Sequence, residues 1–307
     1  MSRSTSSALT RPSHAAHSVN PHRSARTLAQ IPLLDPKLYQ PHAQRPVRSK
    51  MRELDKDTLI MPHRHAWGQL AISTGGVIRV SLPDATYLVP PHRAVWVPPG
   101  VEHAVTLVET ARLYTLYFLP QAHGGGAQAA WMDEADWQQC RVLEASHLMR
   151  ALVVEMDTRS DQAAPLTAAQ LQRESHLSAL LCDEVRRAPV IALGVRLPQD
   201  KRLKTLCEAI IDNPTRHTTL DQWALDSGAS LRTVARLFHN ELGCTFTQWR
   251  QQVVLAKAVA LAAQRMPMAH IATELGYTPS AFSALVRRTV GMTPAAFLGQ
   301  QKALQTL

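Results

Sequence analysis

The chain has 307 residues, 45% of them apolar and 19% charged, which is enough for two globular domains that each bury a core. No run approaches 18 apolar residues, so we expect no segment that spans a membrane. The four cysteines lie far apart without a CxxC pair, which argues against a disulfide framework or zinc finger and favours the reducing cytoplasm.

The charge is distributed unevenly along the chain. Residues 1–52 hold nine Lys or Arg against one acidic residue, residues 53–200 hold 12 against 17, and residues 201–307 hold 12 against six. Basic ends around an acidic middle favour a polyanionic partner for the ends. A solvated basic surface has the same composition, so charge alone does not decide between the two.

Residues 1–46 form the first segment. Six prolines interrupt it, and its apolar side chains show little periodicity. Such a segment cannot bury enough apolar area to fold by itself. We expect a disordered N-terminal arm over residues 1–46.

Short apolar runs separated by turn residues follow between about 58 and 118. Dipeptides such as Gly75-Gly76 and Pro83-Asp84 separate them. Short strands at this spacing predict a small antiparallel barrel or double sheet, which we assign to residues 47–120. The runs are 69–73, 77–82, 94–97 and 113–118.

This segment resembles the cupin barrel in two motifs, His63-x-His65-x3-Gln69-x6-Gly76 and Pro98-x-Gly100-x2-His103. In cupin enzymes the histidines and a carboxylate converge inside the barrel on a divalent metal, and three imidazoles suit Zn, Fe, Ni or Cu. His63 and His65, separated by one strand residue, would share a face. Gln69 stands at the carboxylate position, which weakens a cation site. The resemblance implies either a metal-free effector pocket or a divalent-metal site, lined by His63, His65, Gln69 and His103.

Helical periodicity begins after the barrel. Apolar side chains recur at helical intervals over residues 136–158 and again over 167–187, and residues 190–200 read as a linker. We assign residues 121–200 to connecting helices. Their apolar face at 140–156 is either a homodimer interface or a cover for the barrel.

The last third of the chain contains a repeat at an offset of 48 residues. Each copy predicts a short helix, a glycine turn and a second helix, and a helix over about 247–264 joins the copies. The second helices are expected over 230–242 and 278–290. Matching pairs are Ala224 and Ala272, Gly228 and Gly276, Leu237 and Leu285, Gly243 and Gly291, and Thr245 and Thr293.

Local chemistry specifies the helix boundaries. Thr219 with Gln222 predicts a capping box, and Ser230 and Thr278 lie at matching N-cap positions. The glycine of each turn can adopt the left-handed conformation that ends a helix.

The second helix of the first copy has one apolar side, formed by Leu231, Val234, Phe238 and Leu242. Packing that side against the preceding helix leaves the polar side outward, where it fits a major groove about 12 Å wide. A connecting helix of about 17 residues spans about 25 Å, so two such helices can reach successive grooves about 34 Å apart.

The segments "SLRTVARLFHNELGCTFTQW" and "IATELGYTPSAFSALVRRTVGMTPAAF" resemble the AraC/XylS family of bacterial transcription regulators. The resemblance implies an AraC-type DNA-binding domain over residues 203–302. Its first recognition helix would carry Ser230, Arg232, Thr233, Arg236 and His239, and its second Thr278, Ser280, Ser283, Arg287 and Arg288. Ala284 stands where the family often has a polar residue, so Arg287 and Arg288 are expected to hold phosphates.

These features predict an α+β protein with a cupin-like barrel, a helical connector and an all-α domain with two helix-turn-helix units. We interpret it as a transcription regulator, not an enzyme, with operator DNA, a small-molecule effector and RNA polymerase as partners. A metal-dependent cupin enzyme with an accessory helical domain is one alternative, and Gln69 and the complete repeat count against it. An architectural DNA binder without an effector is another, and the cupin motifs count against that.

Overall fold

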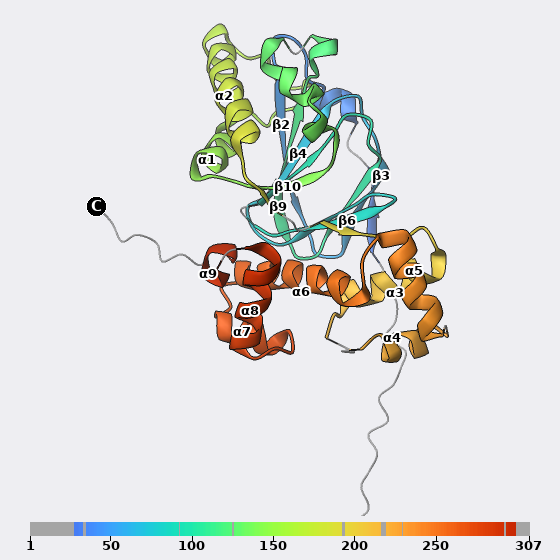
Figure 1. The fold of residues 1–307 in the computed structure, drawn as a ribbon. Helices are drawn as coiled ribbons and strands as arrows, with labels where there is room; N and C mark the ends of the chain where they lie inside the picture. Colours follow the sequence, from blue (N-terminus) through green and yellow to red (C-terminus); the bar gives the residue numbers. More distant parts are fainter. Residues whose placement is uncertain are drawn as a thin grey trace, which may run out of the picture.

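The computed structural model describes residues 28–32, 35–91, 93–124, 126–191, 194–215, 219–228, 230–291 and 293–298 (Figure 1). It shows a β-barrel with two helices along one side and a helical layer beneath it. The fold is α+β, as the sequence predicts.

The barrel is built from two six-stranded sheets, ordered β1-β3-β8-β5-β6-β12 and β11-β10-β7-β4-β9-β2. All neighbouring strands are antiparallel except β1, which runs parallel to β3. The strands are β1 Ala29–Ile31, β2 Val47–Leu54, β3 Thr58–His63, β4 Gly68–Ser73, β5 Ile78–Ser81, β6 Ala85–Val89, β7 Arg93–Val97, β8 His103–Leu107, β9 Ala111–Phe118, β10 Arg141–Glu144, β11 Val190–Ile191 and β12 Gly194–Arg196.

Alternating side chains of the second sheet belong to two different cores. In β4, Ala71 packs inside the barrel with Val95. Its neighbours Leu70 and Ile72 belong to a second cluster on the outer face, together with Trp96. The period of two therefore separates a barrel interior from an outer face that needs a cover.

The cover comes from α1 (His147–Glu155) and α2 (Ala168–Arg187), which lie beside the second sheet (Figure 1). Met149, Leu152 and Leu181 are buried in the outer cluster. Of the two alternatives for the apolar face at 140–156, these contacts favour the cover. The 3-10 helices are η1 Pro36–Tyr39, η2 Gln121–His123, η3 Ala127–Asp133 and η4 Ala135–Gln138.

The structure differs from the sequence prediction on either side of α1 and α2. Residues 141–144, predicted as helix, form β10, because Val142 and Leu143 enter the two opposite cores and β10 pairs with β7. Residues 190–191 and 194–196, predicted as linker, add β11 and β12 to the sheet edges. Pairing with a neighbouring strand thus overrides local periodicity in both places.

The segment predicted as a disordered arm can be compared with the structure only from residue 28 onward. Residues 1–27 lie outside the described residues. From residue 28 the structure differs from the prediction, since β1 pairs with β3. Arg45 also forms ion pairs with Asp157 at 3.0 Å and Glu174 at 3.4 Å, which fix the end of the arm to the helical cover.

The C-terminal helices follow the predicted repeat. Gly228 and Gly276 have φ of 64° and 74°, the left-handed conformation expected at each turn. The capping box predicted for Thr219 and Gln222 is not formed: Thr219 makes no side-chain cap hydrogen bond, and its φ is −115° against −71° at Ser230. The helices are α3 Lys201–Asp212, α4 Leu220–Ser227, α5 Leu231–Leu242, α6 Phe246–Ala263, α7 Met268–Glu274, α8 Pro279–Val290 and α9 Pro294–Phe297.

Candidate functional site

The first helix-turn-helix unit is α4 and α5. The Ser230 hydroxyl accepts a hydrogen bond from the main-chain N–H of Thr233 at 3.2 Å and so fixes the start of α5. Val234 and Phe238 are buried, as predicted. Leu231, predicted to pack on α4, is 45% exposed instead, at the first residue of α5.

The polar side of α5 is free. All five residues assigned to it from the sequence are exposed, namely Ser230, Arg232, Thr233, Arg236 and His239. An exposed helix face of Arg, Thr and His side chains offers donors that can reach guanine and phosphate oxygens.

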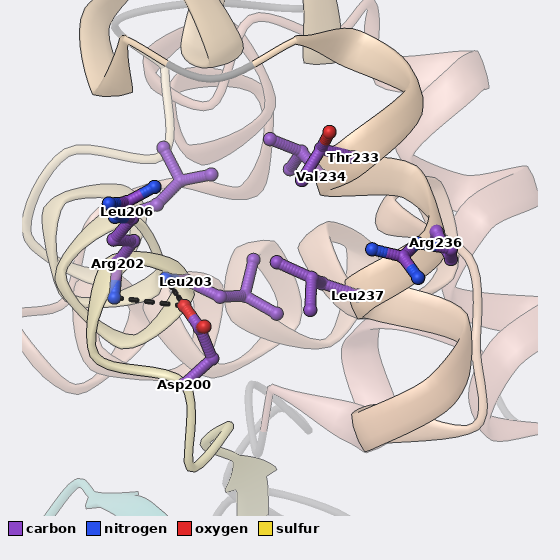
Figure 2. A pocket seen from close by; sticks show the side chains of 8 residues that line it. All are labelled: Asp200, Arg202, Leu203, Leu206, Thr233, Val234, Arg236 and Leu237. Atoms are coloured by element: carbon purple, nitrogen blue, oxygen red, sulfur yellow. Dashed lines mark hydrogen bonds between the residues drawn. The ribbon is translucent and has the colours of Figure 1, made fainter.

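A hollow of about 180 Å³ lies between α3 and α5 (Figure 2). Leu203 of α3 and Leu237 of α5 approach each other across it, and Arg236 stands at its edge. Asp200 caps α3 by accepting hydrogen bonds from the N–H groups of Arg202 and Leu203. Arg236 is exposed, so its guanidinium is accessible from solvent.

The second unit, α7 and α8, repeats this geometry. The Thr278 hydroxyl accepts from the N–H of Ala281 at 3.2 Å. Ser283 is half-buried, and its hydroxyl donates to the Pro279 carbonyl at 2.9 Å, so its donor is already used. The remaining assigned residues are exposed, namely Thr278, Ser280, Arg287 and Arg288.

The helix between the units, α6, also contacts the barrel. The indole N–H of Trp249 donates to the main-chain carbonyl of Arg196 on β12 at 2.7 Å. At the other end of α6, the Gln264 amide bonds to the Glu109 carboxylate in the barrel. From α3, Asp212 pairs with Arg79 of β5 at 2.9 Å. The two helix-turn-helix units are thus attached to the barrel through the helix that joins them.

A second site lies inside the barrel, where the structure brings together all four residues predicted from the cupin motifs. The ring centres of His63 and His103 are 4.3 Å apart, and those of His65 and His103 are 5.3 Å apart. His65 Nε2 lies 3.0 Å from Gln69 Oε1. His63 and His65 do not share a strand as expected, since β3 ends at His63 and His65 lies in the following loop.

Each histidine uses its Nδ1 atom on a main-chain carbonyl. The acceptors are Met61 at 2.8 Å for His63, Trp67 at 2.7 Å for His65 and Val101 at 3.0 Å for His103. A neutral imidazole has a single N–H, so these contacts place the proton of His63 and His103 on Nδ1 and the lone pair on Nε2. Both ring nitrogens of His65 face oxygens, so a neutral His65 requires that the Gln69 amide turn its NH2 group toward Nε2. Burial lowers the pKa of all three rings, that of His103 to about 3, which keeps them uncharged at neutral pH.

The cupin resemblance implies a divalent metal here, and the number of donors matches. One nitrogen of each histidine lies within 4.8 Å of the others. The charge of the site does not match a metal, because Gln69 stands in place of a carboxylate. In addition, Lys50 is buried beside the cluster, and its positive charge lowers the pKa of all three imidazoles. A buried ammonium beside the cluster would repel a cation bound by the histidines. The residues present therefore do not fit a divalent metal.

Sequence reasoning did not identify the basic side chains of this site. Lys50 of β2 is 5% exposed, and its Nζ donates to the Tyr117 hydroxyl at 2.6 Å. Trp67 stacks on His65 with ring centres 5.4 Å apart. The available signal was the alternation Arg48-x-Lys50-x-Arg52, which is the period of a strand with one basic face.

Comparison with known proteins finds one family match over the barrel region and another over the helix-turn-helix units. The family described as "AraC-like ligand binding domain" matches residues 55–181, and that described as "Helix-turn-helix domain" matches residues 223–300. Among the described residues, no helix combines the length and apolar character needed to cross a bilayer.

Several relatives are regulators. The HTH-type transcriptional regulator NimR of Escherichia coli (strain K12) is 30% identical over 248 residues, 80% of this chain and 84% of NimR. The HTH-type transcriptional regulator RipA of Corynebacterium glutamicum is 28% identical over 102 residues, 33% of this chain and 31% of RipA. Among solved structures, unsaturated fatty acid bound ToxT from Vibrio cholerae is 10% identical with a TM-score of 0.33, covering 85% of this chain and 98% of that chain.

The match to NimR extends over both halves of the chain, from the barrel to the helix-turn-helix units. A ligand-binding domain and a DNA-binding domain therefore occur here in one polypeptide. The chain belongs to the AraC family of helix-turn-helix transcriptional regulators.

Proposed function

We propose that this regulator reads its operator with α5 and α8, and that a small molecule bound inside the barrel changes its affinity for that operator. The observation that carries the proposal is the free polar side of both helices. Every assigned residue of α5 and every one of α8 except Ser283 is exposed.

The spacing of the two helices supports simultaneous binding. α6 has 18 residues, a length of about 27 Å at about 1.5 Å per residue. With the flanking units added, α5 and α8 can reach successive major grooves about 34 Å apart. Arg232 and Arg236 supply bidentate donors on α5, whereas Arg287 and Arg288 lie in the last turn of α8 and would hold phosphates.

The contacts between barrel and helices support control by a ligand. Trp249 and Gln264 attach α6 to β12 and to Glu109, so a movement of the sheet is passed to the helix that sets the spacing of α5 and α8. A ligand that binds the barrel better in one arrangement shifts the regulator toward that arrangement and changes its operator affinity.

Further assignments belong to this proposal. The proposed division keeps the bounds expected from the sequence, 1–46, 47–120, 121–200 and 203–302, except that β1 and β10 to β12 are assigned to the barrel of the sensor. We infer a cytoplasmic protein without enzymatic activity that contacts RNA polymerase. It would dimerise through the outer side of α1 and α2, where Leu148, Val154 and Leu180 are about half exposed.

The operator can be found by selection from random duplex DNA with the full-length protein. The expected result is one enriched sequence with two recognition elements about one helical turn, or 10 base pairs, apart. A variant with Arg232→Ala and Arg236→Ala serves as control and should lose the enrichment at one element only. Recovery of sequences without a common element would contradict the proposal.

A further inference from the structure

Strand β2 turns a row of three basic side chains toward the barrel interior. Arg48, Lys50 and Arg52 alternate along β2, and Leu54, which follows in the same alternation, belongs to the interior core. The alternate residue Val47 belongs to the outer cluster. Buried cations of this kind are stable only when an opposite charge faces them.

Only the first of the three has such a partner among the described residues. Arg48 Nη1 lies 2.6 Å from the Asp161 carboxylate, and its Nη2 donates to the Arg159 carbonyl at 3.2 Å. Lys50 Nζ has the neutral hydroxyl of Tyr117 at 2.6 Å and the Tyr117 ring centre at 4.9 Å. Burial and the nearby Arg52 lower the pKa of Lys50 to about 8, so the ammonium is still mostly protonated at pH 7.

Two neighbouring donors are also unused. Arg52 Nη1 and the indole Nε1 of Trp67 are buried and have no hydrogen-bond partner among the described residues. A buried donor without a partner carries a desolvation penalty that a bound acceptor would relieve. Trp67 belongs to the same cluster, since its ring centre lies 5.7 Å from that of Tyr117.

Among the described residues, no carboxylate contributes to the electrostatic field at Lys50 or Arg52. The two ends outside the described residues, 1–27 and 299–307, contain no Asp or Glu. A bound anion that accepts hydrogen bonds would balance the buried Lys50 and reach the unpaired Nη1 of the half-buried Arg52.

We propose that the effector is a small organic carboxylate whose anionic group binds Lys50 and Arg52 at the polar end of the barrel. The inference rests on the proposed effector function and names its ligand class. The rings of Tyr39, Trp67 and Tyr117 surround this end, with Lys50 Nζ 5.8 Å from the Tyr39 ring centre, which suits an apolar or planar body behind the carboxylate. The His103 Nε2 atom is buried without a hydrogen-bond partner among the described residues and would accept from a hydroxyl or N–H of the ligand.

The test compares carboxylates with their neutral amides, which have nearly the same shape. Propionate, phenylacetate, benzoate and cinnamate, each beside its primary amide, are titrated calorimetrically into the full-length protein at pH 7 with EDTA present. At least one carboxylate should bind, and its amide should bind at least about tenfold more weakly, as expected for a lost charge-assisted bond.

Substitutions then locate the site. Lys50→Met should weaken the carboxylate at least about tenfold, and Arg52→Gln should weaken it less. Lys56→Met removes an exposed lysine from the turn after β2 and should leave binding unchanged, which makes it the matched control. If circular dichroism shows that Lys50→Met does not fold, Lys50→Arg and Arg52→Gln still test the proposal. Lys50→Arg should retain carboxylate binding, and Arg52→Gln should weaken it.

Three outcomes overturn the carboxylate proposal. Carboxylates that bind no better than their amides, or that bind equally well to Arg52→Gln and Lys50→Met, would exclude it. Binding that disappears with EDTA would place the anion on a metal. Operator affinity measured in the same samples separates the two proposals. A carboxylate that Lys50 binds without any change in operator affinity contradicts only the proposed effector control. An amide that changes operator affinity contradicts only the proposed carboxylate ligand class.

Discussion

The indole N–H of Trp249, in the helix that joins the two helix-turn-helix units, donates to the main-chain carbonyl of Arg196 at the edge of the barrel, 2.7 Å away. Trp249 is fully buried, so its indole N–H depends on this carbonyl for a hydrogen-bond partner. This bond links a strand of the sensor to the element that sets the spacing of the DNA-reading helices.

Trp249→Phe should therefore lower the free energy of unfolding by about 1–2 kcal/mol, because the Arg196 carbonyl loses its donor while the ring contacts remain. Urea unfolding followed by circular dichroism measures the change. Arg79→Ala, which breaks the exposed pair with Asp212 at the same domain boundary, should cost roughly 0.5 kcal/mol. Equal losses in the two variants would argue against a specific role for the indole N–H.

Arg236→Ala should cost about 1–3 kcal/mol on the selected operator and relax preference at one base pair, because α5 would lose a bidentate donor to guanine. Competition gel shifts with single-base operator variants measure both effects. Arg186→Ala removes an exposed arginine from α2 and is the control. A variant that weakens operator and random DNA equally would assign Arg236 to phosphates.

Arg287→Ala and Arg288→Ala should weaken binding to every sequence alike. Each should also reduce the slope of log K against log salt by about one unit, because one phosphate contact and its released counterion are lost. Titrations at four salt concentrations give the slope. An unchanged slope, or a loss confined to the operator, would contradict the phosphate assignment of the residue concerned.

Purified protein should contain well under one equivalent of metal, and chelator should leave operator binding unchanged, since Lys50 and Gln69 disfavour a cation beside the histidines. Gln69→Glu should raise the affinity for added Zn²⁺ by supplying the missing negative charge. In that variant, His65→Ala should remove the gain. Stoichiometric metal in the unmodified protein would show that the charge argument is wrong.

The buried histidines predict a loss of stability in mild acid. The pKa of His103 is about 3 in the folded protein and about 6.5 when unfolded, so the unfolded chain takes up the proton first as the pH falls below about 6.5. Stability should decline toward pH 3 by up to about 1.4 kcal/mol per pH unit for each such group. His103→Gln should decline less between pH 7 and 5 than the parent protein or than His176→Gln on the exposed side of α2. Parallel curves would contradict the buried neutral ring.

The helical half of the molecule could be predicted closely because the residues that set each helix boundary lie next to it in the sequence. Ser230 and Thr278 cap the helices that they were expected to cap, and Gly228 and Gly276 adopt the left-handed turn. A cap or a turn depends on residues within a few positions of it, so a single sequence contains the whole signal.

The barrel was harder to predict because its partners are distant in sequence. Residues 141–144 show helical spacing and become a strand only because β7, more than 40 residues away, offers an edge. Lys50 donates to Tyr117, which lies 67 residues further along the chain, so no residue close to Lys50 in the sequence indicates a buried cation. The cupin motifs located His63 and His103 because a family pattern already encodes the long-range contact.

Apolar side chains of the barrel, of the β12 edge and of the helices α3 to α9 form one continuous buried cluster, in which Val195 and Leu197 lie between sensor and reader. If the DNA-binding domain were fused to another sensor, this shared apolar surface would be exposed to water unless the new sensor supplied the same apolar residues. Chimeras cut between residues 197 and 203 should therefore aggregate, whereas chimeras that keep the β12 edge with the helices should stay soluble.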